Sequence, residues 1–401
     1  MSALTRPRRV LVAVLILVFI VLFARRDNSS REREGSVEVL NSTLGFQEIF
    51  VVNLVERTDR RDAMTLAAAV TDLSFTFVPG VRGADVAEKV LPPSERSKNE
   101  NWVGKTGSWR AHMNVLQRIV HENITSALIM EDDADWATDL KSQARSLSLA
   151  TQSYLQPLRR SPSHSLSTLH ARAPSLDDEN PVIALRSTPA VLPPRTSPYG
   201  DDWDVLWLGH VGSHLPTESV PSGVEPRSFL TLFVANDDTV PAPHRLKRHP
   251  FAKDPDRFAS AFPPHTRVVH AARGNAGIQA YAVSQRGARK LLHRFGLEEF
   301  GASYDLMLRD WCDGVGGGHE MEEGRKGEGG PVCVTTQPPI FSQWYSSGGS
   351  DIHGIGGGYF RGTGSTYIRR SVMLNLRRLV AGKGASEGLV DQWPDEGKGA
   401  W

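Results

Sequence analysis

Cysteine is almost absent from this chain, and its scarcity excludes several kinds of protein. The 401 residues include two cysteines, Cys312 and Cys333, so a multi-disulfide scaffold cannot form. The pair can close one disulfide in an oxidising compartment, and otherwise it remains two free thiols. No C-x-x-C or H-E-x-x-H pattern occurs either, which argues against a zinc site.

A surplus of either charge is also lacking. There are 46 Lys and Arg residues against 45 Asp and Glu residues, a formal net charge of +1. This balance excludes a nucleic-acid-binding protein that relies on bulk positive charge, so we expect no nucleic-acid partner. Hydrophobic residues make up 40% of the chain, and this fraction allows a sizeable core.

A long apolar run without charge covers residues 10–24, with two arginines on each side. As a helix it would span about 23 Å, short of a typical bilayer core but long enough for a thin bilayer with snorkelling arginines. We expect a transmembrane signal-anchor at 10–24, with a cytosolic tail at 1–9 and a flexible stem at 25–45. A cleaved signal peptide is the alternative, although the small residues of a cleavage site fit poorly here.

Three N-x-[ST] triplets begin at Asn28, Asn41 and Asn123 and are candidate N-glycosylation sites. The arginine counts on the two flanks of the apolar run are nearly equal, so they do not fix its orientation. If these triplets are glycosylated, the part of the chain that follows the apolar run lies in the lumen. We therefore expect a single-pass type II protein of the Golgi or ER membrane.

Strand and helix patterns alternate from Phe46 onwards. Expected strands cover residues 49–54, 75–78, 127–130, 203–209, 267–270 and 278–283, and expected helices cover 62–70, 108–122 and 285–295. This alternation predicts an α/β domain at 46–380 with a Rossmann-like, mainly parallel sheet flanked by helices. Ligands of such sheets bind where the strands end.

Three segments lack the apolar periodicity of the domain. Residues 141–200 are rich in Ser, Pro, Arg and Leu, and we interpret them as an exposed low-complexity insertion. The Gly-rich stretch at 314–330 is expected to form a loop. Residues 381–401 are expected to form a flexible C-terminal tail.

An acidic cluster follows the apolar strand at 127–130. It contains Glu131, Asp132, Asp133 and Asp135. Carboxylates this close repel one another, so a protein that holds them in a cleft usually supplies a hard divalent cation. Such a cation would neutralise a diphosphate at the sheet edge, and a solvated acidic turn is the alternative.

Basic residues that follow the first strand are a second candidate feature. Arg57, Arg60 and Arg61 lie in the turn after the strand at 49–54. They could pair with the same diphosphate or with Asp59, or they could simply be solvated.

Four segments, in order, resemble glycosyltransferase family 25. They are residues 50–64, 109–136, 203–210 and 280–292. The family includes bacterial lipooligosaccharide galactosyltransferases and animal procollagen galactosyltransferases, and the chain is most similar to filamentous-fungal members. The resemblance implies a GT-A type fold, a UDP-sugar donor, and Mn²⁺ or another divalent cation at Glu131, Asp132 and Asp133.

The resemblance also implies roles for individual residues. Those that match the family's pattern and are expected near the nucleotide are Asn53, Arg57, Asp59, Arg60, Arg61 and Tyr281. Family members are taken to be inverting, which requires a base for the acceptor hydroxyl. Asp305 matches the family's second acidic position and is the candidate base or acceptor-side residue, with a helix N-cap as the alternative.

One segment departs from the family's pattern. Trp109, Arg110 and His112 stand where bacterial members have a more familiar motif, so acceptor contacts cannot be transferred there. His112 could face substrate or lie in the core, and we favour the core.

These observations predict a metal-dependent transferase that moves a hexose such as galactose from a UDP-sugar to a glycan or glycoprotein hydroxyl. The alternative is a non-catalytic nucleotide-sugar or glycan-binding protein with the same fold. A glycoside hydrolase is a weaker third possibility, because one contiguous acidic run does not place two carboxyl groups on opposite sides of a bond.

Overall fold

The computed structural model describes most of the chain after its N-terminal region. The described residues are 38–92, 102–172, 181–218, 223–224, 226–246, 257–315, 330–345, 363–384 and 388–399. The predicted cytosolic tail, the apolar run at 10–24 and Asn28 lie outside them. None of the helices in the described part combines the length and apolar character that a membrane span requires.

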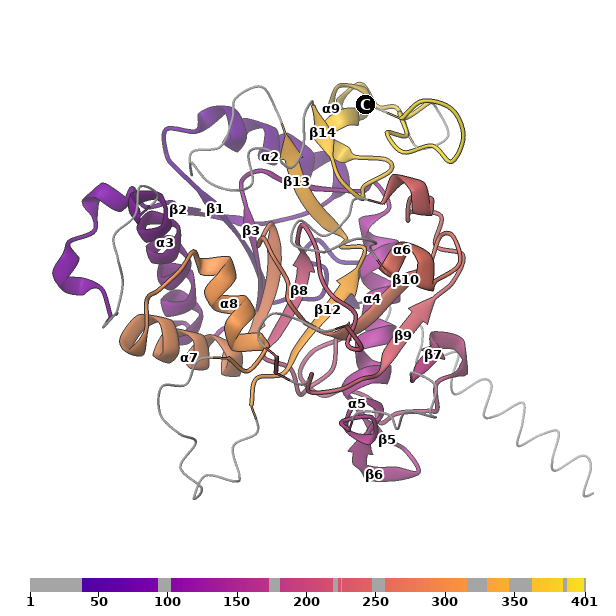
Figure 1. Ribbon diagram of the computed structural model, residues 1–401. Coiled ribbons are helices and arrows are strands. Elements are labelled where there is room, and N and C mark those ends of the chain that lie inside the picture. The colour runs from indigo at the N-terminus through magenta and orange to yellow at the C-terminus, as the bar shows by residue number, and fades with distance from the viewer. Residues whose placement is uncertain are drawn as a thin grey trace, which may run out of the picture.

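A large sheet forms the centre of the molecule (Figure 1). Its main path runs in the order β2-β1-β3-β11-β8-β12-β10-β9-β7, and β4, β13 and β14 extend it from β8. The strands of this path are β1 (Glu48–Asn53), β2 (Thr76–Pro79), β3 (Ser126–Glu131), β7 (Val182–Ala184), β8 (Val205–Gly209), β9 (Thr231–Val234), β10 (Arg267–Ala271), β11 (Ala280–Ser284) and β12 (Cys333–Gln337). The extension contains β4 (Ala134–Trp136), β13 (Phe341–Tyr345) and β14 (Gly364–Ser365). A separate hairpin pairs β5 (Pro157–Leu158) with β6 (Ser161–Ser165).

The sheet is mixed. β1 pairs in parallel with β2 and β3, as the alternating pattern predicts. However, β11 lies antiparallel between β3 and β8, and β10 is antiparallel to both β9 and β12. An apolar run predicts that a strand is buried, but its direction depends on the path by which the chain returns to the sheet.

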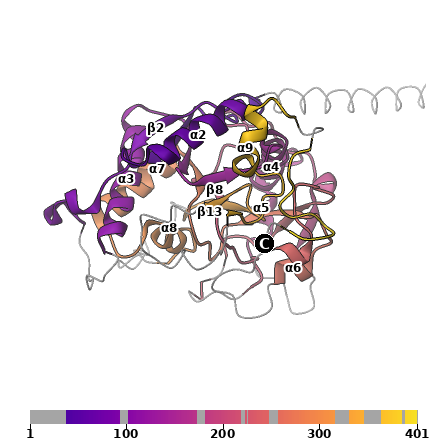
Figure 2. The ribbon, with the colours of Figure 1, turned by 90° about the horizontal axis from the view of Figure 1, so that it is seen from above.

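Helices cover both faces of the sheet (Figures 1 and 2). One layer contains α2 (Thr58–Thr71), α4 (Leu140–Leu155) and α9 (Val372–Val380), and the other contains α3 (Trp102–His121), α7 (Gln285–His293) and α8 (Tyr304–Cys312). Shorter helical segments are α5 (Leu166–Leu169), α6 (Arg257–Ala261), η1 (Gly83–Asp85), η2 (Glu88–Val90), η3 (Leu185–Ser187), η4 (Pro243–Arg245) and η5 (Arg294–Glu298). The α/β architecture expected from the sequence is confirmed.

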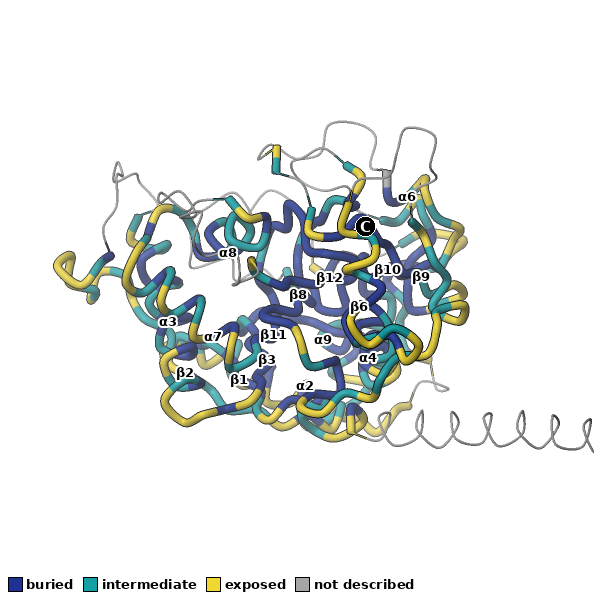
Figure 3. Tube along the Cα trace, turned by 90° about the horizontal axis from the view of Figure 1, so that it is seen from below, coloured by how far each residue is buried: buried dark blue, intermediate teal, exposed yellow. Residues whose placement is uncertain are grey.

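Side chains of β3 alternate between the two halves of the core. Leu128 and Met130 pack in the cluster beneath α2, α4 and α9, whereas Ala127 and Ile129 pack in the cluster beneath α3, α7 and α8. Figure 3 shows the central strands as a continuous buried region. A strand buried on both faces needs an uninterrupted apolar run, which explains why β3 is recognisable in the sequence.

The prediction of an exposed insertion at 141–200 is wrong for its first part. Residues 140–155 form α4, whose buried face includes Leu140, Ala144, Leu147 and Tyr154. Polar residues between them obscure this spacing, but the hydroxyl of Ser148 donates to the carbonyl of Pro198. Hydroxyl groups that bond to nearby carbonyls can be buried with the apolar face.

The predicted flexible tail is instead packed against the domain where the structure describes it. Within 388–399, the side chain of Gln392 donates to the hydroxyl of Ser365 over 2.9 Å, and the Trp393 indole donates to the Ser365 carbonyl over 3.0 Å. Arg369 forms an ion pair with Asp391 at 2.6 Å. The polar composition of this segment reflects these specific contacts rather than an unpacked chain.

The predicted stem also ends earlier than expected. Val39 and Leu44 are buried in the core cluster around α2 and α4, so the folded domain already includes residues 38–45. These two apolar residues are too few to show a period in the sequence.

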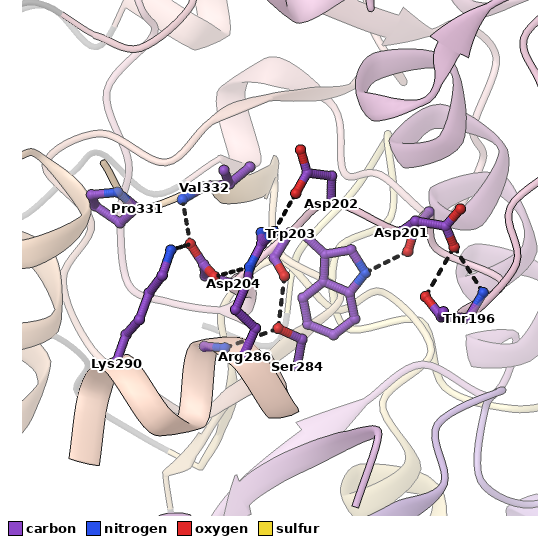
Figure 4. Close-up of polar contacts among 12 residues, drawn as sticks. Thr196, Asp201, Asp202, Trp203, Asp204, Ser284, Arg286, Lys290, Pro331 and Val332 are labelled. Carbon is purple, nitrogen blue, oxygen red and sulfur yellow. Dashed lines mark hydrogen bonds and ion pairs between the residues drawn. The ribbon is translucent and has the colours of Figure 1, made fainter. Parts of the chain in front are cut away.

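A buried carboxylate joins three segments at the start of β8 (Figure 4). Asp204 is fully buried and accepts hydrogen bonds from Arg286 Nε at 2.8 Å, Lys290 Nζ at 2.9 Å and the Val332 amide at 2.9 Å. Gly287 allows this approach, because a Cβ there would lie 2.2 Å from the Asp204 carbonyl oxygen. Asp204 therefore ties α7 and the chain before β12 to β8.

We expect Asp204→Ala to lower the free energy of unfolding by about 2 to 3 kcal/mol, because it removes the buried acceptor of the Val332 amide and of Lys290 and leaves Arg286 with Asp202. Asp202→Ala removes a carboxylate that pairs with the same Arg286 but is mostly exposed, and it should cost less than about 1 kcal/mol. Urea unfolding of the two variants checks this difference. Equal losses would show that burial of Asp204 is not decisive.

Candidate functional site

The carboxyl ends of β1 and β3 meet at one edge of the sheet. The two strands are parallel neighbours, with Val52 opposite Glu131. The next residue of each strand end therefore lies close to its neighbour, and Asn53 Nδ2 donates to Asp132 Oδ2 over 2.8 Å. This is the position at which an α/β sheet binds its ligand.

Arg60 supplies the positive charge at this edge. It lies in the first turn of α2, and its Nη1 contacts Asp132 Oδ1 at 2.5 Å and Asp133 Oδ2 at 3.2 Å. The guanidinium is largely buried, and the two carboxylates outweigh the effect of burial and raise its pKa. One guanidinium therefore bridges two adjacent carboxylates.

Asp133 is only partly satisfied by its partners. Its Oδ2 also accepts from Gln343 Nε2 of β13 at 3.3 Å, and its carbonyl accepts from the Trp344 amide. Burial raises the pKa of Asp133 to about 6, although Arg60 acts in the opposite direction. Asp133 Oδ1 is buried and has no hydrogen-bond partner among the described residues. The residue pattern does not predict the Gln343 contact, because Gln343 lies about 210 positions away on another strand.

Glu131 belongs to a second acidic group. Burial raises its pKa well above the usual value, and the charges of Asp133, Asp132 and Asp305 add to the effect. Asp305, in the first turn of α8, accepts from the amide of Gly277 at 3.1 Å. The two candidate acidic positions of the sequence are thus electrostatically connected across the sheet edge.

The three carboxylates predicted to bind a metal ion are Glu131, Asp132 and Asp133. In the part of the chain that the structure describes, no three side chains of His, Cys, Asp or Glu are grouped so that they could hold a metal ion. Asp132 and Asp133 instead share Arg60. The donor chemistry still fits a hard divalent cation, because Asp132 contacts the amide nitrogen of Asn53, and the amide oxygen of the same side chain is buried without a partner among the described residues.

The other residues expected near a nucleotide have separate contacts. Arg57 binds Asp59 through two hydrogen bonds of 2.9 and 2.8 Å, and this contact lowers the pKa of Asp59 to about 2. The guanidinium of Arg61 lies 4.4 Å from the ring centre of Phe77. Of the arginines in this turn, Arg60 is the one that pairs with the acidic cluster in the described contacts.

Tyr281 is placed in the core rather than at a ligand surface. It is fully buried on β11, and its hydroxyl hydrogen-bonds with His112 Nδ1 at 3.1 Å and with the Tyr304 hydroxyl at 3.1 Å. A side chain with no exposed surface cannot contact a nucleotide in this conformation. The expectation that His112 lies in the core is confirmed, because it is 1% exposed and stacks on Tyr304.

Asp135 has a structural role that its place in the acidic run does not reveal. It is fully buried and accepts hydrogen bonds from the hydroxyls of Ser365 and Ser371 and from the amide of Met373. Burial raises its pKa to about 6, and these hydrogen bonds limit the rise. Asp135 therefore fixes the chain that follows the site to β14 and α9.

The two cysteines form a disulfide. Cys312 at the end of α8 and Cys333 at the start of β12 have Cα atoms 5.7 Å apart. The bond closes the Gly-rich stretch, of which residues 316–329 lie outside the described residues. Structural disulfides are typical of secreted and lumenal proteins.

Two of the candidate glycosylation sites lie at the surface. Asn41 is exposed, and its Oδ1 accepts from the amides of Thr43 and Gly45. Asn123 is exposed immediately after α3, in a left-handed backbone conformation with φ of 55°. Surface exposure is what a bulky glycan requires.

Fold and site together define an α/β protein whose candidate ligand site lies at the carboxyl ends of its central strands. Residues 46–161 match the model of glycosyltransferase family 25 (LPS biosynthesis protein). The resemblance drawn from the sequence is confirmed for these residues. They include Asn53, Arg60, Asp132 and Asp133.

Curated relatives match the chain over a third of its length or less. Procollagen galactosyltransferase 1 of Danio rerio is 28% identical over 120 residues, 27% of this chain and 20% of the relative. Procollagen galactosyltransferase 2 of Mus musculus is 24% identical over 147 residues, 33% of this chain and 23% of the relative. A probable inactive glycosyltransferase 25 family member 3 of Bos taurus is 24% identical over 119 residues, which are 26% of this chain and 20% of the relative. The chain thus spans about a fifth of the length of these relatives.

The buried His112 predicts an acid-sensitive fold. An ordinary histidine binds its proton near pH 6.5, but burial lowers the pKa of His112 to about 3, so the unfolded state gains this proton first as the pH falls. The stability is therefore full above pH 6.5 and decreases toward pH 3. We expect a loss of about 2 kcal/mol between pH 6.5 and pH 5 from this group.

His112→Gln should remove this part of the pH dependence, measured by urea unfolding at pH 7 and pH 5. His121→Gln is the matched control, since His121 is exposed at the end of the same helix and should leave the dependence unchanged. An unaltered pH dependence in His112→Gln would contradict the assignment.

Proposed function

We propose that this protein is a glycosyltransferase that moves a hexose, with galactose as the first candidate, from a UDP-sugar to a hydroxyl group of a glycan or glycoprotein. The observation that carries the proposal lies within the family 25 segment. There, β1 and β3 bring Asn53, Arg60, Asp132 and Asp133 together at the edge of the sheet. This is a charged site at the edge where α/β folds bind ligands.

The proposed donor site uses both signs of charge. A divalent cation such as Mn²⁺, when bound, supplies positive charge to the diphosphate of the donor as the sugar leaves. Asp132, Asp133 and the amide oxygen of Asn53 would hold it. Arg57 precedes α2 and Arg61 lies in its first turn. Together with Arg60 they would add positive charge near the diphosphate.

Asp305 is the proposed base of an inverting transfer. The acceptor oxygen forms a bond to the anomeric carbon while the bond from that carbon to the diphosphate oxygen breaks, and the acceptor proton passes to Asp305. The Gly277 amide orients the Asp305 carboxylate, and the buried ring of Tyr304 anchors the start of α8. The charge of Asp305 also contributes to the raised pKa of Glu131, which supports placing the proposed base near the acidic cluster.

A non-catalytic donor-binding protein is the second candidate function. Two observations favour it: the carboxylates pair with Arg60 in the described structure, and one relative is named as probably inactive. Binding of UDP without release of UDP from any UDP-sugar would distinguish this function from the transferase.

We also propose that the protein is a type II membrane protein of the ER or Golgi with its folded domain in the lumen. The disulfide and the exposed triplets at Asn41 and Asn123 support this placement. The apolar run at 10–24 supports the anchor by sequence.

Release of UDP from a panel of UDP-sugars tests the transferase, with the purified full chain, Mn²⁺ and a range of glycan acceptors. We expect one preferred sugar and loss of release on chelation. Asp133→Asn and Asp305→Asn should each lower the rate about 100-fold or more, through loss of charge stabilisation and of the base respectively.

Asp72→Asn is the matched control for these carboxylate variants. Asp72 is exposed and has a left-handed backbone conformation with φ of 53°, which Asn also adopts. The rate of UDP release by Asp72→Asn should therefore equal that of the wild type. Release that survives both active-site variants would refute the proposed site.

Mobility on a denaturing gel after glycosidase treatment tests the lumenal placement. Protein from a eukaryotic host should migrate faster after treatment, and Asn41→Gln and Asn123→Gln should each remove one glycan's mass. Asn236→Gln is the control, because Asn236 is exposed but not followed by the required triplet. Unchanged mobility of the wild type after treatment would count against the placement.

A further inference from the structure

The acidic site already contains a cation of its own. Asp132 and Asp133 are adjacent in sequence, each is 8% exposed, and both contact the same Nη1 of Arg60. Water contacts little of either carboxylate. Two such buried negative charges therefore require a positive partner. In the described structure Arg60 fills that requirement.

The site also contains oxygen atoms that Arg60 does not satisfy. Asp133 Oδ1 and Asn53 Oδ1 are both buried, and neither has a hydrogen-bond partner among the described residues. Asn53 is 2% exposed, and its Nδ2 bonds to Asp132, so its unpaired oxygen belongs to the same group. Buried oxygens without partners are costly, and here they are hard donors that suit a divalent cation.

A divalent cation bound to this pair of carboxylates would repel the guanidinium of Arg60. Like charges a few ångströms apart repel strongly where little water screens them. Arg60 comes from the first turn of α2, and its long side chain keeps some exposed surface, so it can turn outward while the helix remains in place.

We propose that Arg60 is an exchangeable internal counter-ion: a divalent cation binds Asp132 and Asp133 only by displacing the guanidinium, which then becomes available to the diphosphate of the donor. The inference rests on the proposed function for its second step. Its first step concerns the cation alone and is tested without a donor.

Mn²⁺ binding to the purified full chain tests the displacement. Free Mn²⁺ is followed by electron paramagnetic resonance in the absence of nucleotide. Removal of the competing charge in Arg60→Ala should tighten Mn²⁺ binding about tenfold or more. Asp133→Asn in the Arg60→Ala background should abolish the tight binding, which locates the ion at this pair.

Arg61→Ala is the matched control. It removes one positive charge from the adjacent position of the same helix, but Arg61 packs on Phe77 rather than on the carboxylates. The Mn²⁺ affinity of Arg61→Ala should stay within about twofold of the wild type, because the Arg61 guanidinium packs on the Phe77 ring and forms no ion pair with the carboxylates among the described contacts. An equal gain in both variants would show a general charge effect and overturn the proposal.

Thermal unfolding gives a second measurement. Without metal, Arg60→Ala should unfold at a lower temperature than the wild type, because two buried carboxylates lose their partner. Mn²⁺ should raise the unfolding temperature of Arg60→Ala more than that of the wild type. Arg60→Gln keeps a donor for Asp132 without the charge, and it replaces Arg60→Ala if the latter does not fold.

Two results would overturn the inference. Equal or weaker Mn²⁺ binding in Arg60→Ala and Arg60→Gln would show that the guanidinium does not compete with the ion. Absence of Mn²⁺ binding in all variants would make Arg60 the permanent counter-ion of the pair. Failure of the transferase assay is distinguishable from both, because the affinity difference does not depend on turnover.

Discussion

Repulsion between two neighbouring buried carboxylates is the constraint on which the arrangement of this site depends. Asp132 and Asp133 follow directly on a strand whose first five residues are buried, and each of the two side chains is itself buried. Arg60, from the first turn of α2, neutralises this repulsion by pairing with both carboxylates, and Asn53 at the end of β1 donates a hydrogen bond to Asp132. The charge balance of the site therefore depends on the packing of α2 against the sheet, because that packing places Arg60 beside the carboxylates.

The parallel pairing of β1 with β3 makes that solution possible. Their shared register places the ends of both strands at the same level, so residues almost 80 positions apart in sequence become direct neighbours. On the other side of β3, the antiparallel β11 carries Tyr281 into the core, where it holds the start of α8 and thus Asp305. The edge of the sheet receives its charged groups from both helical layers.

Several central strands and the position of the acidic cluster could be predicted from the sequence. The features that could not be predicted depend on tertiary contacts or on mixed residue patterns. Uninterrupted apolar runs identified β1 and β3, and the residues after them identified the acidic site. The helix at 140–155 was missed because Ser, Thr and Gln fill the gaps between its apolar residues. The pairing of Arg60 rather than Arg61 with the carboxylates depends on helix phase, and the burial of Tyr281 depends on which face of β11 meets α3. Neither follows from spacing alone.

The contacts of Asp135 have a consequence for biosynthesis. Its hydrogen-bond partners lie at Ser365, Ser371 and Met373, so 230 or more residues must still be translated after Asp135 before this buried carboxylate can be satisfied. In a nascent chain that ends after the family 25 segment, Asp135 would keep the hydrogen bond from the adjacent Trp136 amide but would lack those from Ser365, Ser371 and Met373. The contacts of Asp135 can therefore form only after residues 365–373 have been translated.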